Sequence, residues 1–283
     1  LLLRMGEADA ARALVQDIDP GNYTDALADA ALDAYAATGD FTGACPAVAS
    51  RGGGRKEPRW QVVRDICAAF KGDGAGAMQR LDRATGGNLM PRIDMLLAQK
   101  YAGAAGKARR AVTIEWDEVK DMTPWRYGLA IAVGLEPPAE LMRGAGPHYA
   151  HVTALSPAVG LERRAEAADR AAGAGVLSSA AMVDLYSQIY INQDIDGPWA
   201  DRAEKLRDAY SGATPQARLA AMQALWSGND DPVTAYSRQV LTAYAAARLP
   251  VDADHADAAP ELVASMLAAG LDRNALRWAG QAE

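Results

Sequence analysis

The chain has 283 residues, of which 50% are hydrophobic, 6% are aromatic and 23% are charged, and its formal charge is −7 at pH 7. Acidic and basic residues are interspersed, which argues against the clustered positive charge of a nucleic-acid-binding surface. The longest apolar stretch, 127–135, is far shorter than the ~20 residues that a membrane-spanning helix needs. We therefore expect no nucleic-acid partner and no membrane-spanning segment.

The composition predicts an all-α protein. Most of the apolar residues are alanine and leucine, which are strong helix formers, and the alternation of β-branched residues that marks strands is scarce. The start Leu1-Leu2-Leu3-Arg4, which has no methionine, is typical of the end of a helix already under way. The sequence leaves open whether a signal peptide or an earlier repeat precedes it.

An internal repeat runs through the first half of the chain. Four glycines are spaced 33, 33 and 34 residues apart, at Gly6, Gly39, Gly72 and Gly106. An alanine follows each by five residues, at Ala11, Ala44, Ala77 and Ala111, and prolines recur 33 apart at Pro58, Pro91, Pro124 and Pro157. This period is typical of helical-hairpin arrays. We expect each glycine to form the hairpin turn, and each alanine to lie where the two helices approach closely.

The unit that begins at Pro58 illustrates the pattern. Proline suits the first helical turn, apolar residues follow at helical spacing to Phe70, and Gly72 ends the helix. Asp73 is expected to cap the second helix, before the turn at 86–88. The later hairpins are less regular. A helix is predicted at 125–133 and a connection at 144–157, and further helices are predicted at 158–172, 178–191, 198–210, 215–227, 232–247, 260–269 and 272–279.

The glycine, the acid after it and the small alanine resemble the tetratricopeptide (TPR) repeat family, as in Gly6-Glu7, Gly39-Asp40 and Gly72-Asp73. The resemblance implies an α-solenoid of antiparallel helix hairpins, a TPR-like right-handed superhelix with a concave peptide-binding face. We expect regular repeats over 1–144 and degenerate hairpins over 145–283 that pack onto or continue the superhelix. The segment 114–126 resembles uncharacterised α-proteobacterial envelope proteins, which carry no assigned activity.

The two cysteines, Cys45 and Cys67, occupy informative places in the repeat. Cys45 falls near the start of the second helix of one hairpin, and Cys67 near the end of the first helix of the next. Antiparallel neighbours would bring them within disulfide range, although two small buried thiols would fit the same positions. A disulfide would indicate an oxidising compartment such as the periplasm.

Other polar clusters favour ordinary structural roles. Asn192, Asp194, Asp196 and Gly197 match the first half of a calcium loop, but Ala203 stands where a bidentate Glu is needed. His148 and His151 lack further metal ligands. Glu115 and Asp117 flank Trp116 but are too closely spaced to share one helix face. We therefore assign no catalytic, cofactor-binding or metal-binding residue and expect no cofactor.

The predicted function is a non-enzymatic scaffold or adaptor for protein–protein interaction, in a bacterial envelope assembly such as secretion, motility or cell-wall machinery. The partner is a protein, and the chain is a candidate subunit of a larger complex in the periplasm. One alternative is a helical-toroid enzyme or carbohydrate-binding protein of the periplasm that uses carboxylates such as Glu115 and Asp117. The other is a purely structural subunit of a large complex.

Overall fold

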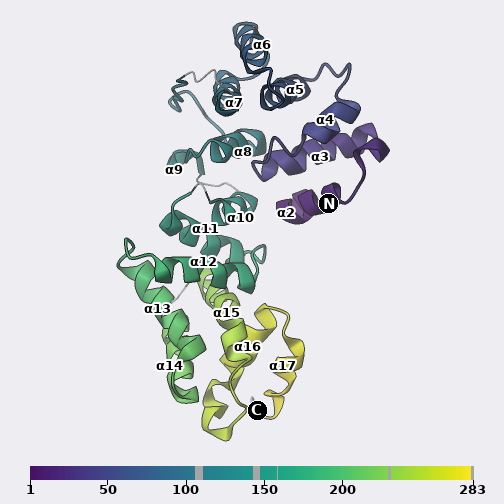
Figure 1. The fold of residues 1–283 in the computed structure, drawn as a ribbon. Coiled ribbons are helices and arrows are strands. Elements are labelled where there is room, and N and C mark those ends of the chain that lie inside the picture. Colours follow the sequence, from purple (N-terminus) through teal and green to yellow (C-terminus); the bar gives the residue numbers. More distant parts are fainter. Residues whose placement is uncertain (106–110, 143–146, 158, 229–230, 282–283) are drawn as a thin grey trace. The chain divides into compact units, whose positions relative to one another are not determined.

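The structure is a computed structural model that describes residues 1–105, 111–142, 147–157, 159–228 and 231–281. In these ranges the chain forms helices joined by turns and loops and contains no strand, so the prediction of an all-α protein is confirmed. The chain divides into two compact units, Leu1–Val152 and Thr153–Glu283. Each unit is described by itself below (Figure 1).

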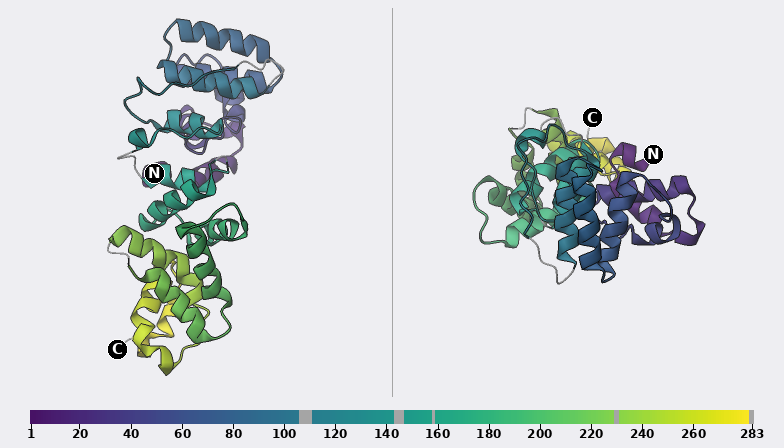
Figure 2. Two further views of the ribbon diagram at one scale, coloured as in Figure 1. Left: turned by 90° about the vertical axis from the view of Figure 1, so that its left-hand side faces the viewer. Right: turned by 90° about the horizontal axis from the view of Figure 1, so that it is seen from above.

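Unit 1 is built from helices that follow one another through short turns. They are α1 (Leu2–Met5), α2 (Ala8–Gln16), the 3₁₀ helix η1 (Pro20–Asn22), α3 (Asp25–Ala37), α4 (Cys45–Arg51), α5 (Pro58–Phe70), α6 (Gly74–Gly86), α7 (Arg92–Ala104), α8 (Pro124–Ala132), α9 (Ala139–Met142) and the first part of α10 (Pro147–Leu155). Helices α5, α6 and α7 pack side by side (Figures 1 and 2).

Unit 2 begins within α10 and also consists of helices. They are α11 (Leu161–Gly173), α12 (Ser179–Ile191), α13 (Pro198–Ser211), α14 (Pro215–Trp226), α15 (Pro232–Ala246), η2 (Ala253–Ala258), α16 (Ala259–Ala268), α17 (Asp272–Leu276) and η3 (Ala279–Gln281). Their bounds differ by a few residues at most from the helices that the sequence predicts after residue 158. Helix α15 contacts α11, α12, α13, α14 and α16 and so forms the centre of this unit.

The helix starts follow directly from local sequence. Proline occupies the first turn of α5, α8, α13, α14 and α15, where its missing N–H leaves no intrahelical bond unmade. Side-chain oxygens of the preceding residues accept a hydrogen bond from the first turn at Thr24, Asp73, Thr123, Ser178, Thr214 and Asp231. Such caps each stabilise a helix by about 1 kcal/mol, so the helix boundaries depend little on tertiary contacts.

Three of the four repeat glycines lie in the described residues, and all three adopt positive φ where a helix ends. The φ angles are 89° at Gly6, 70° at Gly39 and 107° at Gly72, a conformation that other L-residues rarely adopt. Gly106 lies outside the described residues. The alanines five residues later are buried at Ala11, Ala44 and Ala77, which agrees with close helix approach at those positions.

One helix that the repeat pattern predicts is not found in the described residues after 110. Ala111 is exposed, and residues 111–123 form no helix. The second helix expected after Gly106 is therefore absent over this segment, and the prediction that Ala111 packs between two helices is wrong. In the sequence, lysine follows Gly106, whereas an acidic residue follows each of the other three repeat glycines. A helix that started after Gly106 would therefore lack the N-terminal acidic residue that favours helix formation.

The predicted connection at 144–157 is also wrong in part. Helix α10 occupies 147–155 of this segment, and the division between the two units falls within it, between Val152 and Thr153. The expected boundary at 144/145 lies outside the described residues. Proline is well tolerated as the first residue of a helix, and Pro147 begins α10.

The core of unit 1 brings together parts of the chain that are distant in sequence. Phe41, which follows α3, packs edge-on against Trp125 of α8 with ring centroids 5.0 Å apart and against Tyr101 of α7 at 5.7 Å. Helix α8 packs directly on α3 as well as on α7. The close approach of α8 to α3 requires a glycine at position 128, because a Cβ on Gly128 would lie 1.8 Å from the carbonyl oxygen of Ala36.

Candidate functional site

A cavity of about 760 Å³ lies in unit 1. Its wall is mostly apolar, and it collects side chains from α1, α2, α3, α5, α7, α8 and α10. The lining residues are Leu3, Arg4, Gly6, Ala8, Asp33, Ala36, Ala37, Arg59, Met90, Asp94, Thr123, Pro124, Trp125, Tyr127, Tyr149 and Val152. We call this cavity the apolar pocket. Pockets of this size and character are typical binding sites.

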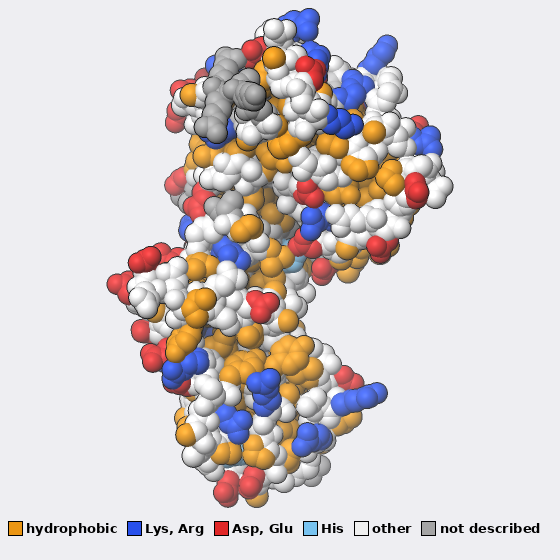
Figure 3. Space-filling view, in the orientation of Figure 1, with side chains coloured by type: hydrophobic (Ala, Val, Ile, Leu, Met, Phe, Trp, Pro, Cys, Tyr) orange, Lys and Arg blue, Asp and Glu red, His pale blue; other side chains and the backbone are white. Residues whose placement is uncertain are grey.

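Four charged residues line the apolar pocket. Asp33 of α3 accepts a hydrogen bond from the Arg59 guanidinium of α5, and both side chains are about half exposed. Exposed pairs of this kind contribute little to stability. Arg4 is exposed and forms no ion pair within the described residues. The pocket therefore offers a cation beside an apolar wall. Across the face of unit 1 in Figure 3, acidic and basic side chains are mixed with apolar ones.

Asp94, the fourth charged residue, belongs to a buried ion pair. Its Oδ1 accepts from Arg126 Nε at 2.8 Å and its Oδ2 from Arg126 Nη2 at 3.2 Å, and both side chains are only 5% exposed. Arg126 Nη1 also donates to Asp121 Oδ1 at 3.0 Å. Burial raises the pKa of the Asp94 carboxyl above its ordinary value, and the Arg126 guanidinium partly offsets this effect. The pair holds α7 and α8 in register beside the pocket.

Aromatic side chains of α8 and α10 form another part of the wall. The Tyr127 hydroxyl donates to the Tyr149 carbonyl oxygen at 3.3 Å, the Tyr149 hydroxyl donates to the Met122 carbonyl at 3.0 Å, and the two rings meet edge to face. Trp125 is 5% exposed, and its indole Nε1 finds no acceptor among the described residues. This nitrogen has almost no accessible surface, so Trp125 contributes apolar ring surface, and not a hydrogen-bond donor, to the wall of the pocket.

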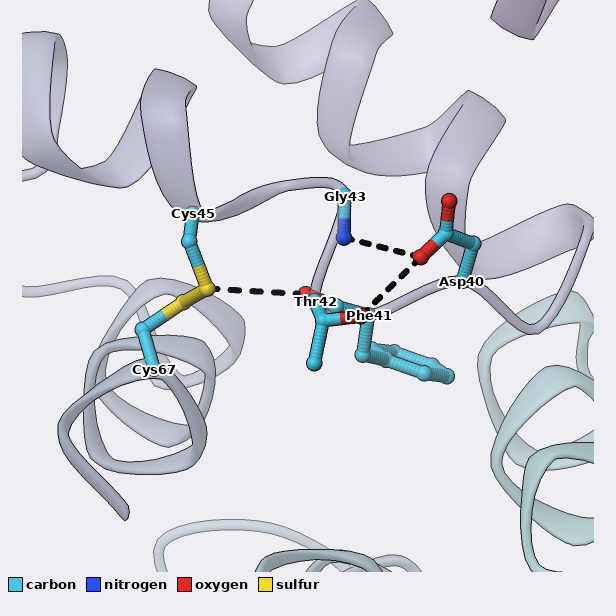
Figure 4. The surroundings of a disulfide bond; sticks show 6 residues. All are labelled: Asp40, Phe41, Thr42, Gly43, Cys45 and Cys67. Carbon is cyan, nitrogen blue, oxygen red and sulfur yellow. Dashed lines mark hydrogen bonds between the residues drawn. A yellow bond between two sulfur atoms is a disulfide. The ribbon is translucent and has the colours of Figure 1, made fainter. Parts of the chain in front are cut away.

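Cys45 and Cys67 form a disulfide that joins the start of α4 to α5, with Cα atoms 5.6 Å apart (Figure 4). Of the two alternatives that the sequence leaves open, the structure contains the disulfide. The segment before Cys45 is ordered by Asp40, whose Oδ1 accepts from Gly43 N at 2.8 Å and from the Thr42 hydroxyl at 3.2 Å. The bridge therefore fixes α5, which carries Arg59, to the loop that carries Phe41.

The acidic residues that the sequence singled out also cluster, although not on a helix. Glu115 and Asp117 lie in the irregular segment 111–123, so the spacing of residues on a helix face does not limit their side chains. Both line a second cavity of about 480 Å³, together with Arg126 and Lys120. Asp94 lines the apolar pocket while its partner Arg126 lines this second cavity, so the buried pair connects the two walls.

The remaining candidate clusters show no convergence on a ligand. Asn192 Oδ1 accepts a hydrogen bond from Asp194 N at 2.9 Å, which is a local turn before α13. His151 Nδ1 is buried without a hydrogen-bond partner, 4.0 Å from Asp9 Oδ2, and the side chain of His148 lies outside the described set. Across the described residues, no three His, Cys, Asp or Glu side chains are placed to hold a metal ion.

The apolar pocket, the Asp94–Arg126 pair and the role of Gly128 are not predicted from the sequence. One signal existed for the pair. Asp94 and Arg126 are separated by 32 residues, close to the repeat period, so they occupy nearly equivalent places in successive repeats. No comparable signal marks Gly128, because it stands within an apolar stretch that predicts only a buried helix.

The chain matches no protein-family model, and comparisons with curated proteins and with solved structures return no significant match. Among the described residues, no helix combines the length and the apolar character that crossing a bilayer requires.

Proposed function

We propose that this chain is a tetratricopeptide-like helical-repeat protein that acts as a non-enzymatic scaffold or adaptor in an oxidising compartment of the bacterial envelope, the periplasm. In this proposal the apolar pocket of unit 1 takes an apolar side chain of a partner polypeptide. The observation that carries the proposal is a pocket of about 760 Å³ with a mostly apolar wall.

A polypeptide suits this pocket for two physical reasons. An aliphatic or aromatic side chain would remove apolar wall from water, at roughly 25 cal/mol for each Å² buried. Arg4 at the same pocket favours an acidic residue next to the apolar one in the partner.

The repeat assignment is supported by the positive-φ glycines at helix ends and by the packing of α5, α6 and α7. The packing of α8 on α3 is the feature that an open right-handed superhelix does not explain, because α3 and α8 belong to distant hairpins. The Cys45–Cys67 disulfide supports an oxidising compartment, since disulfides are rare in the cytosol. Mass spectrometry of native material with two free thiols would remove this support.

Photo-crosslinking tests the binding proposal. A benzoylphenylalanine placed at Ala37, which lines the pocket, is expected to capture a partner polypeptide from envelope extract, whereas the same group at Gln79, an exposed position of α6 outside the pocket, is not. Ala37→Trp fills the pocket and should abolish co-purification of the captured partner, while Gln79→Trp should not. Equal capture at both positions, or co-purification unaffected by Ala37→Trp in a folded variant, would contradict the proposal.

A second candidate, a carbohydrate-binding protein or hydrolase, is favoured by the carboxylates of Glu115 and Asp117 in one cavity of about 480 Å³. A hydrolase of this kind needs two carboxyl groups that flank the bond to be cleaved. Glu115→Gln and Asp117→Asn test it. Turnover of a soluble oligosaccharide that both substitutions abolish would replace the scaffold proposal with an enzymatic one.

A further inference from the structure

A small polar pocket of about 240 Å³ lies in unit 2, where α13, α14 and α15 meet. One face of α13 contributes most of its wall, and the end of α14 and the middle of α15 complete it. The lining residues are Pro198, Asp201, Arg202, Lys205, Ala224, Leu225, Ser227 and Arg238. We call it the cationic pocket. It belongs to unit 2 alone and is independent of the function proposed for unit 1.

Behind the cationic pocket, two arginines share a single carboxylate. Arg238, which is 2% exposed, donates from Nη1 to Asp169 Oδ1 at 2.7 Å and from Nη2 to Asp169 Oδ2 at 2.5 Å. Arg202 Nη1 lies 3.4 Å from Asp169 Oδ2 and donates to the Tyr186 hydroxyl at 3.2 Å. Asp169 therefore balances one of two guanidinium charges, and the other remains in the wall of the pocket.

Within the part of the chain that the structure describes, the Tyr186 phenol beside these arginines does not neutralise the excess charge. Burial raises the pKa of Tyr186 to about 12, so its phenol stays neutral at physiological pH. Lys205 adds a further positive charge at the pocket and forms no ion pair within the described residues, which leaves Asp201 as the only acid among the lining side chains. Three cations thus face two carboxylates, of which one, Asp169, lies behind the wall.

The arginines also retain hydrogen-bond donors. A guanidinium has five N–H groups. For Arg202, Nε and Nη2 have no acceptor among the described residues, and for Arg238 the same holds for Nε. The Arg202 guanidinium is held in place by stacking on Trp199, with its central carbon 4.6 Å from the ring centroid. Fixed guanidinium groups with unused donors match the geometry of carboxylate and phosphate oxygens.

We propose that the cationic pocket is a binding site for one small oxyanion, held by Arg202, Arg238 and Lys205. The oxyanion could come from either of two sources: free inorganic phosphate, or the C-terminal carboxylate of a polypeptide. Asp201 opposes the ligand by its charge and so sets an upper limit on affinity. A single anion would offset the excess charge, and the small volume excludes larger ligands from the pocket.

The test is an NMR titration of the full chain labelled with ¹⁵N in its arginine side chains. The probes are sodium phosphate, acetylated dialanine with a free carboxylate, and the same peptide amidated, all at constant ionic strength. We expect saturable shifts of the Arg202 and Arg238 Nε–H signals with a dissociation constant on the order of 1 mM. Binding of phosphate alone identifies free phosphate as the source, and binding of the free-acid but not the amidated peptide identifies a C-terminus.

Two substitutions of exposed residues act in opposite directions. Lys205→Met should weaken binding about tenfold because it removes one cation, and Asp201→Asn should tighten it about threefold because it removes the opposing charge. Arg273→Gln, an exposed cation outside the pocket, is the matched control and should leave binding unchanged. The proposal is overturned if neither phosphate nor the free-acid peptide gives saturable shifts, or if Lys205→Met and Asp201→Asn bind as the unsubstituted chain does.

Discussion

Removal of the disulfide should destabilise unit 1 by an amount that follows from the length of the loop it closes. Cys45 and Cys67 are 22 residues apart. In the chain-entropy account, closing a loop of this length in the unfolded state stabilises the folded one by about 3 kcal/mol. For a unit of this size, that loss lowers the midpoint of thermal unfolding by roughly 10 °C.

The assay compares three states of the full chain, which are the oxidised protein, the protein reduced with dithiothreitol, and the Cys45→Ala/Cys67→Ala variant. Reduction keeps both sulfur atoms in place and so isolates the effect of the cross-link. The double variant additionally loses the packing of Cys67, which is 3% exposed, so it should be the least stable of the three. Hydrogen exchange read by mass spectrometry reports the two units separately.

The expected result is faster exchange in α4 and α5 on reduction and unchanged exchange in α15, because the bridge lies entirely in unit 1. Two outcomes would refute the reasoning. A midpoint that moves by less than about 2 °C on reduction would mean that the cross-link constrains the unfolded chain far less than its loop length implies. Equal acceleration in α15 would mean that the effect is not local to unit 1.

Three further predictions concern unit 1. Gly128→Ala should lower the free energy of unfolding by about 3 kcal/mol in urea denaturation, because its Cβ would overlap backbone of α3. Arg126→Met should cost about 3–5 kcal/mol because it leaves the Asp94 carboxylate buried and unpaired. With the pKa of that carboxyl raised, the variant should regain stability as pH falls, and a pH-independent loss would contradict this. For Asp29, whose pKa is lowered by its hydrogen bond from Arg55, the stability that Asp29→Asn removes should be constant near neutral pH and shrink as pH falls below the ordinary carboxyl range.

The helices of this protein could be predicted well because their signals are local. Proline in the first turn, a capping side chain before it and a glycine after the last turn each act within a few residues. The predicted helices at 198–210 and 215–227 therefore lie within one residue of α13 and α14. Local patterns gave the wrong prediction at 147–155, which is predicted as part of a connection although proline begins α10 there.

The candidate sites could not be predicted in the same way. The apolar pocket joins Leu3 to Tyr149, and the cationic pocket joins Pro198 to Arg238. Which of these distant residues meet at a pocket is decided by how the helices pack, and packing depends on the fit of many side chains at once. The disulfide could be predicted as one of two alternatives only because the repeat period made the positions of both cysteines comparable.

The amino-acid sequence alone determined the all-α class, the ends of most helices and the turns at Gly6, Gly39 and Gly72, since these depend on backbone sterics and short-range hydrogen bonds. Tertiary structure alone decided that α8 packs on α3 through Gly128, that Asp94 meets Arg126, and that Arg202 and Arg238 share Asp169. These contacts join residues far apart in the chain, so their free energy depends on packing that no local pattern encodes.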